Sequence, residues 1–210
     1  MEHEPGHDEQ MDAQRASDIL QDARARATRA LVIRRPVLFA VWGVAWLAGD
    51  GAIWLSVRGQ RPYAGPTPGA LITLIFVLAA ATIASVILVG RAASGIGGLS
   101  DLRRRLLLFA YLAGFVAVLV LEAAIDHAGA SRGVVGVYGA AAPVLLAGVV
   151  VAASSAALFD WSVFGLGCWF LVVGAGSGFA GPVAVWAVSA LAGGVALLLT
   201  AALGRRLRGL

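Results

Sequence analysis

The sequence contains no lysine, a single cysteine, three histidines and few charged residues of any kind. Only 13% of the residues are charged and 60% are hydrophobic, whereas soluble domains are about 25% charged and about 45–50% apolar. This shortage of charge excludes an ordinary soluble fold. All sixteen basic residues are arginine, a bias that, with abundant Ala, Gly and Val, is typical of a GC-rich bacterial genome.

The scarcity of cysteine and histidine excludes several kinds of site. Cys168 lies inside an apolar run, so we expect neither a disulfide framework nor a cysteine metal site. Residues 176–178, Gly-Ser-Gly, are similar to the serine setting of rhomboid proteases, but no histidine occurs in a later span to act as the base. An H-E-x-x-H motif is absent as well. The sequence therefore predicts neither an enzyme nor a resident metal or cofactor.

Long apolar runs occupy most of the chain. Residues 36–57 form the first, with about 21 apolar residues, enough for one helix to cross a hydrocarbon core ~30 Å thick. Further runs lie at about residues 70–90, 106–125, 134–153, 161–173 and 182–203. We therefore predict an all-α, polytopic membrane protein with six transmembrane helices. The interruption between the fourth and fifth runs is short, which leaves five spans as an alternative.

The arginines indicate how the helices are oriented. With six spans and the N-terminus inside, twelve arginines from residue 24 onward fall on the cytoplasmic side, and only Arg58, Arg61 and Arg132 fall outside. Cytoplasmic loops of membrane proteins carry the excess of positive charge, so both termini are predicted to be cytoplasmic, in a bacterial plasma membrane. The net charge of +4 fits anionic lipid headgroups better than nucleic acid, because the arginines flank apolar segments.

The polar N-terminal region precedes the first run. We expect residues 1–10 to be a disordered tail and residues 11–35 to form an amphipathic cytoplasmic or interfacial helix. Residues 36–204 then form the six-helix bundle, and residues 205–210 a basic cytoplasmic tail. Arginines near the membrane surface are candidate contacts to anionic lipid or to a cytosolic protein partner. They are Arg24, Arg26, Arg29, Arg103, Arg104 and Arg105.

Acidic residues inside the apolar runs are candidates for a binding site. Asp50 lies roughly 20 Å from the cytoplasmic end of the first run, and Glu122 lies at about the same height in the third. Asp126 follows Glu122 by one helical turn. A carboxylate at membrane depth must be neutral, paired or in contact with water, and two in one site suit a proton or a cation. The alternative is that each acid is hydrated or paired at the outer boundary.

Tryptophans recur with Asp50 at four-residue spacing, on one slowly drifting helix face. Trp46 lies deep enough to line a cavity, and Trp54 lies at the level of the outer aromatic belt. The candidate substrate- or ion-binding residues are therefore Asp50, Glu122, Trp46, Trp54 and Asp126. They predict a transporter-like or channel-like bundle with an acidic cavity in its outer half. Small residues in the later spans allow a homo-oligomer.

A second function remains open on the same residues. The chain is alternatively a non-transporting membrane anchor or regulatory subunit that binds a cytosolic regulator or ATPase through residues 11–35 and the loop with Arg103, Arg104 and Arg105. Residues 42–66, WGVAWLAGDGAIWLSVRGQRPYAGP, resemble the opening of a group of small actinobacterial membrane proteins of uncharacterised function. That resemblance implies a small multi-pass protein of transporter-like type and carries no catalytic motif. Some of these proteins are encoded beside winged-helix regulators, which is consistent with the anchor hypothesis.

Overall fold

The computed structural model describes residues 15, 18, 35–93, 99–156 and 160–206. All regular structure in these residues is helical. The first helix is described from Arg35 to Val57. It is followed by α2 (Pro68–Ala93), α3 (Leu99–His127), α4 (Arg132–Ala156), α5 (Trp161–Ser177), the short 3-10 turn η1 (Gly178–Ala180), α6 (Gly181–Val188), the π-helical segment η2 (Ser189–Gly194) and α7 (Val195–Arg206).

Five helical stretches among the described residues are long and apolar enough to cross a membrane. Four correspond to the first four predicted spans: Arg35–Val57, Pro68–Leu88, Arg105–His127 and Arg132–Ser155. The fifth is the 44-residue stretch Trp161–Gly204, which contains both the fifth and the sixth predicted spans. The predicted all-helical, membrane-type fold is therefore confirmed. By length and composition the described residues contain five candidate spans, so the prediction of six spans is not confirmed.

The stretch Trp161–Gly204 is not one straight helix. It turns at η1, and Gly181 there has a φ of +82°, a left-handed conformation that glycine adopts without steric cost. Pro182 follows within the first turn of α6, where the missing N–H leaves no hydrogen bond unmade. α5 then packs against both α6 and η2. The indole N–H of Trp169 on α5 donates to the Ala192 carbonyl, 3.0 Å away, which joins the two arms of this helical hairpin.

The first helix packs antiparallel against the last one through small residues. A Cβ on Gly193 would collide with the Trp46 ring, and a Cβ on Gly194 would lie 2.7 Å from Leu47 Cγ. A Cβ on Gly43 would in turn lie 2.9 Å from the Gly194 carbonyl oxygen. Small residues let helix backbones approach where lipid supplies no hydrophobic drive for association. The small residues of the last span thus serve packing within the chain.

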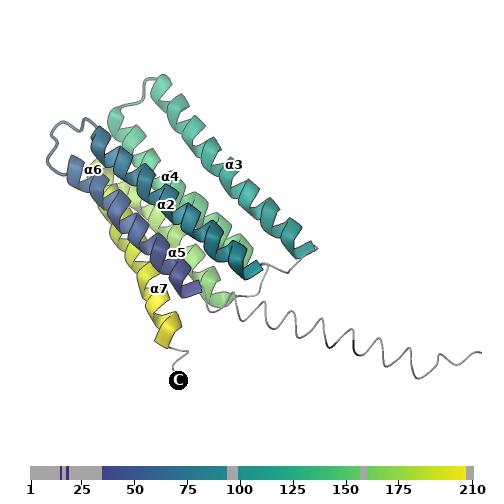
Figure 1. The fold of residues 1–210 in the computed structure, drawn as a ribbon. Coiled ribbons are helices and arrows are strands. Elements are labelled where there is room, and N and C mark those ends of the chain that lie inside the picture. The colour runs from purple at the N-terminus through teal and green to yellow at the C-terminus, as the bar shows by residue number, and fades with distance from the viewer. Residues whose placement is uncertain (1–14, 16–17, 19–34, 94–98, 157–159, 207–210) are drawn as a thin grey trace, which may run out of the picture.

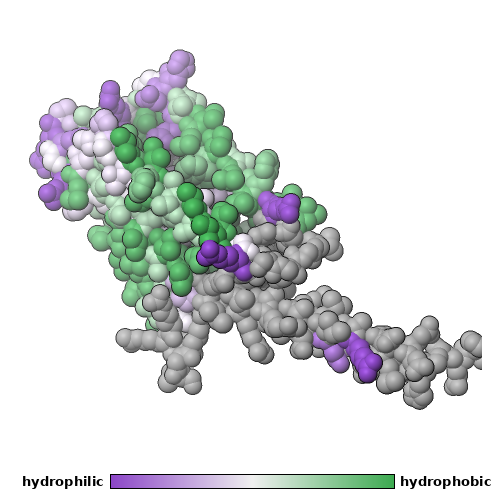
Figure 2. Space-filling model, in the orientation of Figure 1, coloured by the Kyte–Doolittle hydropathy of each residue, from purple (hydrophilic) through white to green (hydrophobic). Residues whose placement is uncertain are grey.

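α2 and α3 expose most of their apolar surface. Phe76 on α2 and Phe109 on α3 are 73% and 72% exposed, and α3 lies at the edge of the bundle, where it packs against α4 (Figure 1). Figure 2 shows hydrophobic residues covering the middle of the molecule, with hydrophilic ones gathered at an end. Apolar side chains that are exposed in a long helix of this kind suit contact with lipid chains.

Asp160 organises the end of the bundle where the first helix begins. Its carboxylate accepts a hydrogen bond from the Val163 N–H and caps α5, and it forms an ion pair with Arg35. Partial burial by itself raises the pKa of Asp160, but the bonds from Val163 and Arg35 together hold it below its ordinary value. A carboxylate cap of this kind stabilises a helix by about 1 kcal/mol. The first helix and α5 are thus joined at this end.

The predicted N-terminal tail and amphipathic helix lie outside the described residues, apart from Arg15 and Asp18, which are both helical and exposed. Residues 205 and 206 of the predicted basic tail continue α7, and the rest of that tail also falls outside the described part of the chain. The first helix begins and α7 ends at the same end of the bundle (Figure 1). A Cβ on Gly204 would lie 3.4 Å from Pro36 Cγ.

Candidate functional site

The inner face of the first helix carries Asp50. Trp46, one turn before it, packs on Phe170 of α5 with the ring centroids 5.0 Å apart. Ile53 and Val57, on the following turns of the same face, are fully buried. Asp50 lies between Trp46 and Ile53 in the helical repeat and is itself partly buried. The carboxylate therefore points towards the interior of the bundle, and within the described residues it forms no ion pair.

The π-helical segment η2 lies opposite Asp50. On one side of that level Gly193 touches Trp46, and on the other side Trp186 belongs to the same core cluster as Ile53. The antiparallel register therefore brings Ser189 and Ala190 to the height of Asp50. Ser189 is fully buried, and its hydroxyl has no hydrogen-bond partner within the residues that the structure describes. A buried hydroxyl without a partner is costly, by about 1–3 kcal/mol, and is uncommon in native structures.

Trp42 lies on the same face of the first helix, about two turns before Asp50. Its indole N–H donates to Ser85 Oγ on α2, at 2.9 Å. Ser85 in turn donates to the Ala81 carbonyl of its own helix, at 2.7 Å. Both polar groups are thus satisfied, so Trp42 is a packing residue that joins the first helix to α2.

Glu122 lies at a different interface, between α3 and α4. A Cβ on Gly139 of α4 would lie 2.7 Å from Glu122 Oε1, so the glycine makes room for the carboxylate. Asp126 follows one turn later on α3 and is exposed. This placement is consistent with Glu122 as a partly buried acid and with Asp126 as a hydrated residue near the helix end.

Tyr63 brings the loop after the first helix into contact with this interface. Its hydroxyl packs against Gly136 of α4, where a Cβ would collide with it. The pKa of Tyr63 is raised, first by burial and then by the Glu122 charge, while the nearby Trp186 indole N–H acts to lower it. The geometry between Trp186 and Tyr63 falls short of a hydrogen bond, and neither buried polar atom has a partner among the described residues. Trp186, Tyr63 and Ser189 were not among the candidate binding residues predicted from the sequence.

The loop itself is held by one glutamine. The Gln60 amide donates to the Ser56 and Gly65 carbonyls and accepts from the N–H groups of Ala64 and Gly65, at 2.8–3.2 Å. Arg132 of α4 donates to the Ala64 carbonyl, at 3.0 Å. Loops of this length are usually mobile unless their backbone groups are satisfied in this way. Gln60 thereby fixes the position of Tyr63 over the bundle.

Trp54 lies between the loop and the bundle. The Arg58 guanidinium carbon is 5.8 Å from the centre of its ring, within cation–π range, and the ring packs on the core cluster of Ile53 and Trp186. These contacts give Trp54 a structural role near the end of the first helix that leads into the loop. Its role as a substrate- or ion-binding residue stays a prediction.

The residues predicted to share one cavity fall into two groups. Asp50 and Trp46 face η2 and α5, whereas Glu122 and Asp126 lie at the α3–α4 interface with Tyr63. A shared Asp50–Glu122 cavity stays a prediction. Of the predicted lipid or partner contacts, Arg105 is exposed at the start of α3, the side chains of Arg103 and Arg104 are not described, and the three N-terminal arginines lie outside the described residues.

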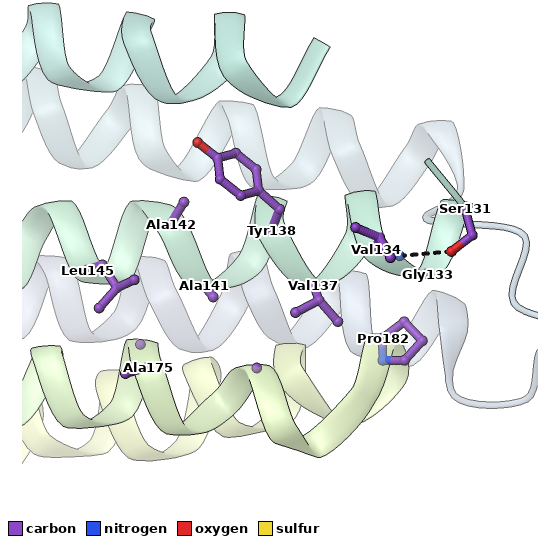
Figure 3. Close-up of a pocket in the computed structure, with 12 residues that line it drawn as sticks. Ser131, Gly133, Val134, Val137, Tyr138, Ala141, Ala142, Leu145, Ala175 and Pro182 are labelled. Carbon is purple, nitrogen blue, oxygen red and sulfur yellow. Dashed lines mark hydrogen bonds between the residues drawn. The ribbon is translucent and has the colours of Figure 1, made fainter. Parts of the chain in front are cut away.

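One groove, with a volume of about 680 Å³, lies between α4, α5 and the start of α6. Its walls are mostly apolar, with Val137 and Leu145 of α4 on the side that faces Ala175 and Pro182 (Figure 3). A second groove, of about 400 Å³, lies along α2. Neither is lined by Asp50 or Glu122. Both lie on apolar surfaces of the kind that lipid chains cover.

Among the described residues, the geometry supports neither a metal site of clustered His, Cys, Asp or Glu residues nor a serine nucleophile at Ser177. In the described part of the chain, no group of three or more His, Cys, Asp or Glu residues is placed to hold a metal ion. Ser177, in the glycine-rich turn, is buried and donates to the Gly174 carbonyl of its own helix, at 3.0 Å. No protein family, curated protein or solved structure matches this chain.

Proposed function

We propose that the chain is a small transporter-like or channel-like membrane protein that moves a proton or a small cation, with Asp50 as the group that binds it. The observation that carries the proposal is the setting of Asp50. It is a carboxylate on the inner face of a membrane-type helix, without an ion pair in the described region, opposite a π-helical segment. Acids at membrane depth mark ion or substrate pathways, and π segments are frequent at functional sites.

The proposal includes six spans with both termini in the cytoplasm. The turn at η1 and the packing of α5 on η2 support a hairpin of two spans within Trp161–Gly204. A straight helix of that length would measure about 66 Å, roughly twice the hydrocarbon thickness. The excess of arginine at the end where the chain begins supports the orientation.

Reporter fusions test this topology. A reporter that is active only in the cytoplasm should be active after Leu210 and inactive within residues 59–68. A reporter that needs the periplasm should give the reverse pattern. Periplasmic activity after Leu210 would contradict the six-span arrangement, because an odd number of crossings would then separate the termini.

Ion flux into proteoliposomes tests the function itself. Vesicles that contain the purified protein should take up protons or sodium down an imposed gradient faster than vesicles made from the same lipid alone. A dye for internal pH and radioactive sodium report the two ions separately. Equal rates in protein-containing and protein-free vesicles, for both ions, would contradict transport. A soluble partner that copurifies and is lost on deletion of residues 1–30 would instead favour the anchor hypothesis.

A further inference from the structure

The π-helical segment η2 changes the hydrogen-bond ladder of the last span. In a π-helix the N–H groups bond to carbonyls five residues earlier, instead of four as in an α-helix. At the end of η2 the N–H of Val195 bonds to the Leu191 carbonyl, four residues earlier. The spacing of the ladder therefore changes here, and π segments are frequent at functional sites.

Two oxygen ligands are available at the level of η2. Ser189 is 0% exposed, and its hydroxyl has no hydrogen-bond partner in the described part of the chain. The Asp50 carboxylate comes from the facing helix, at the height set by the contact between Gly193 and Trp46. Ser189 and Asp50 do not bond to each other. The Ser189 hydroxyl therefore remains available to a ligand.

We propose that a sodium ion binds between the first helix and η2, coordinated by the Asp50 carboxylate and the Ser189 hydroxyl. This assignment rests on the proposed function and names its ion. Hard cations in proteins are bound by oxygen atoms, and both proposed ligands supply oxygen. One carboxylate balances one positive charge. A divalent ion would need a second acid, and Glu122 lies at the other interface, against Gly139.

The position of η2 is fixed from its far side as well. The Trp169 indole N–H donates to the Ala192 carbonyl at 3.0 Å, and Trp46 fills the space above Gly193. These contacts hold the π segment between α5 and the first helix. The site is thus built on packed helices, whose geometry is better defined than that of a loop.

Thermal unfolding of the purified wild-type protein in detergent tests the assignment. Sodium chloride should raise the apparent Tm in a saturable way, because a ligand that binds only the folded state stabilises it. Choline chloride at equal ionic strength should not. The Ser189→Ala variant should need at least a tenfold higher sodium concentration for half of the effect. The matched control is Ser177→Ala, a buried serine whose hydroxyl is satisfied within its own helix. It should respond like wild type.

The outcomes separate this inference from the proposed function. Absence of a sodium-specific rise in Tm, an equal rise with potassium, or identical responses of the two serine variants would overturn the sodium site. Should Ser189→Ala fail to fold, Asp50→Asn should abolish the sodium response. Proton flux without a sodium response would contradict only the sodium site. Sodium stabilisation without any flux would contradict only the transport function.

Discussion

Replacing Asp50 with asparagine is expected to lower ion flux in proteoliposomes at least tenfold, while the apparent Tm in sodium-free buffer stays near that of wild type. Asparagine keeps the shape of the side chain and removes its charge and its titratable proton. A tenfold loss corresponds to ~1.4 kcal/mol in binding or in the barrier. Because Asp50 forms no ion pair with a described residue, its replacement leaves no unpaired charge among them.

Asp126→Asn is the matched control for this experiment. It removes the same charge from an exposed position near the end of α3. Flux should remain within about twofold of wild type, because a hydrated surface carboxylate interacts weakly with a distant ion. Equal losses in the two variants would indicate a general effect of charge. Loss of the folded protein in Asp50→Asn would instead reveal a buried ion pair, whose disruption costs ~3–5 kcal/mol.

Replacing Gly167 with alanine is expected to destabilise the bundle by about 2 kcal/mol, or roughly 4–8 °C in Tm for a chain of this size. The added Cβ would lie 2.5 Å from the backbone nitrogen and 2.8 Å from the Cα of Ala152 on α4. Backbone atoms cannot rotate away as a side chain can, so α4 and α5 must separate. Their close contact also includes Gly148, which faces the Gly167 carbonyl oxygen.

Gly165→Ala, two residues earlier on α5, provides the control. A Cβ at that position meets no atom within 4 Å. Alanine is a better helix former than glycine by roughly 0.5–1 kcal/mol, so Gly165→Ala should be as stable as wild type or slightly more stable. Thermal unfolding of both variants in one detergent gives the comparison. Equal stability of Gly167→Ala and Gly165→Ala would contradict the close packing of α4 on α5.

The sequence predicted the helices well because hydrophobic length is a local property. The first span, predicted from residue 36 to 57, ends where the first membrane-type helix ends, at Val57. The fourth, predicted from 134 to 153, falls within α4 (Arg132–Ala156). The turn at residues 178–181 was marked by glycine and by Pro182, which have direct backbone consequences.

The arrangement of the site depends on contacts that the sequence does not reveal. The residues of η2 have the composition of an ordinary apolar helix, and the packing of Gly193 under Trp46 accompanies its π-helical form. Asp50 and Glu122 have similar depth in the sequence, but depth does not determine which helix each one faces. The ion pair between Arg35 and Asp160 joins residues 125 positions apart. Neighbours of this kind follow from the order in which the helices pack.

The central claim, that Asp50 lies at a water-accessible ion site in the outer half of the bundle, is tested most directly by cysteine labelling. Cys168 is the only native cysteine, so Cys168→Ala provides a cysteine-free background. In that background we expect Asp50→Cys to react with a membrane-impermeant maleimide added outside the cell. Ala48→Cys, at an exposed position on the same helix, should not react, because lipid surrounds it and a thiol needs water to ionise. Failure of Asp50→Cys to react, or equal reaction at both positions, would contradict the claim.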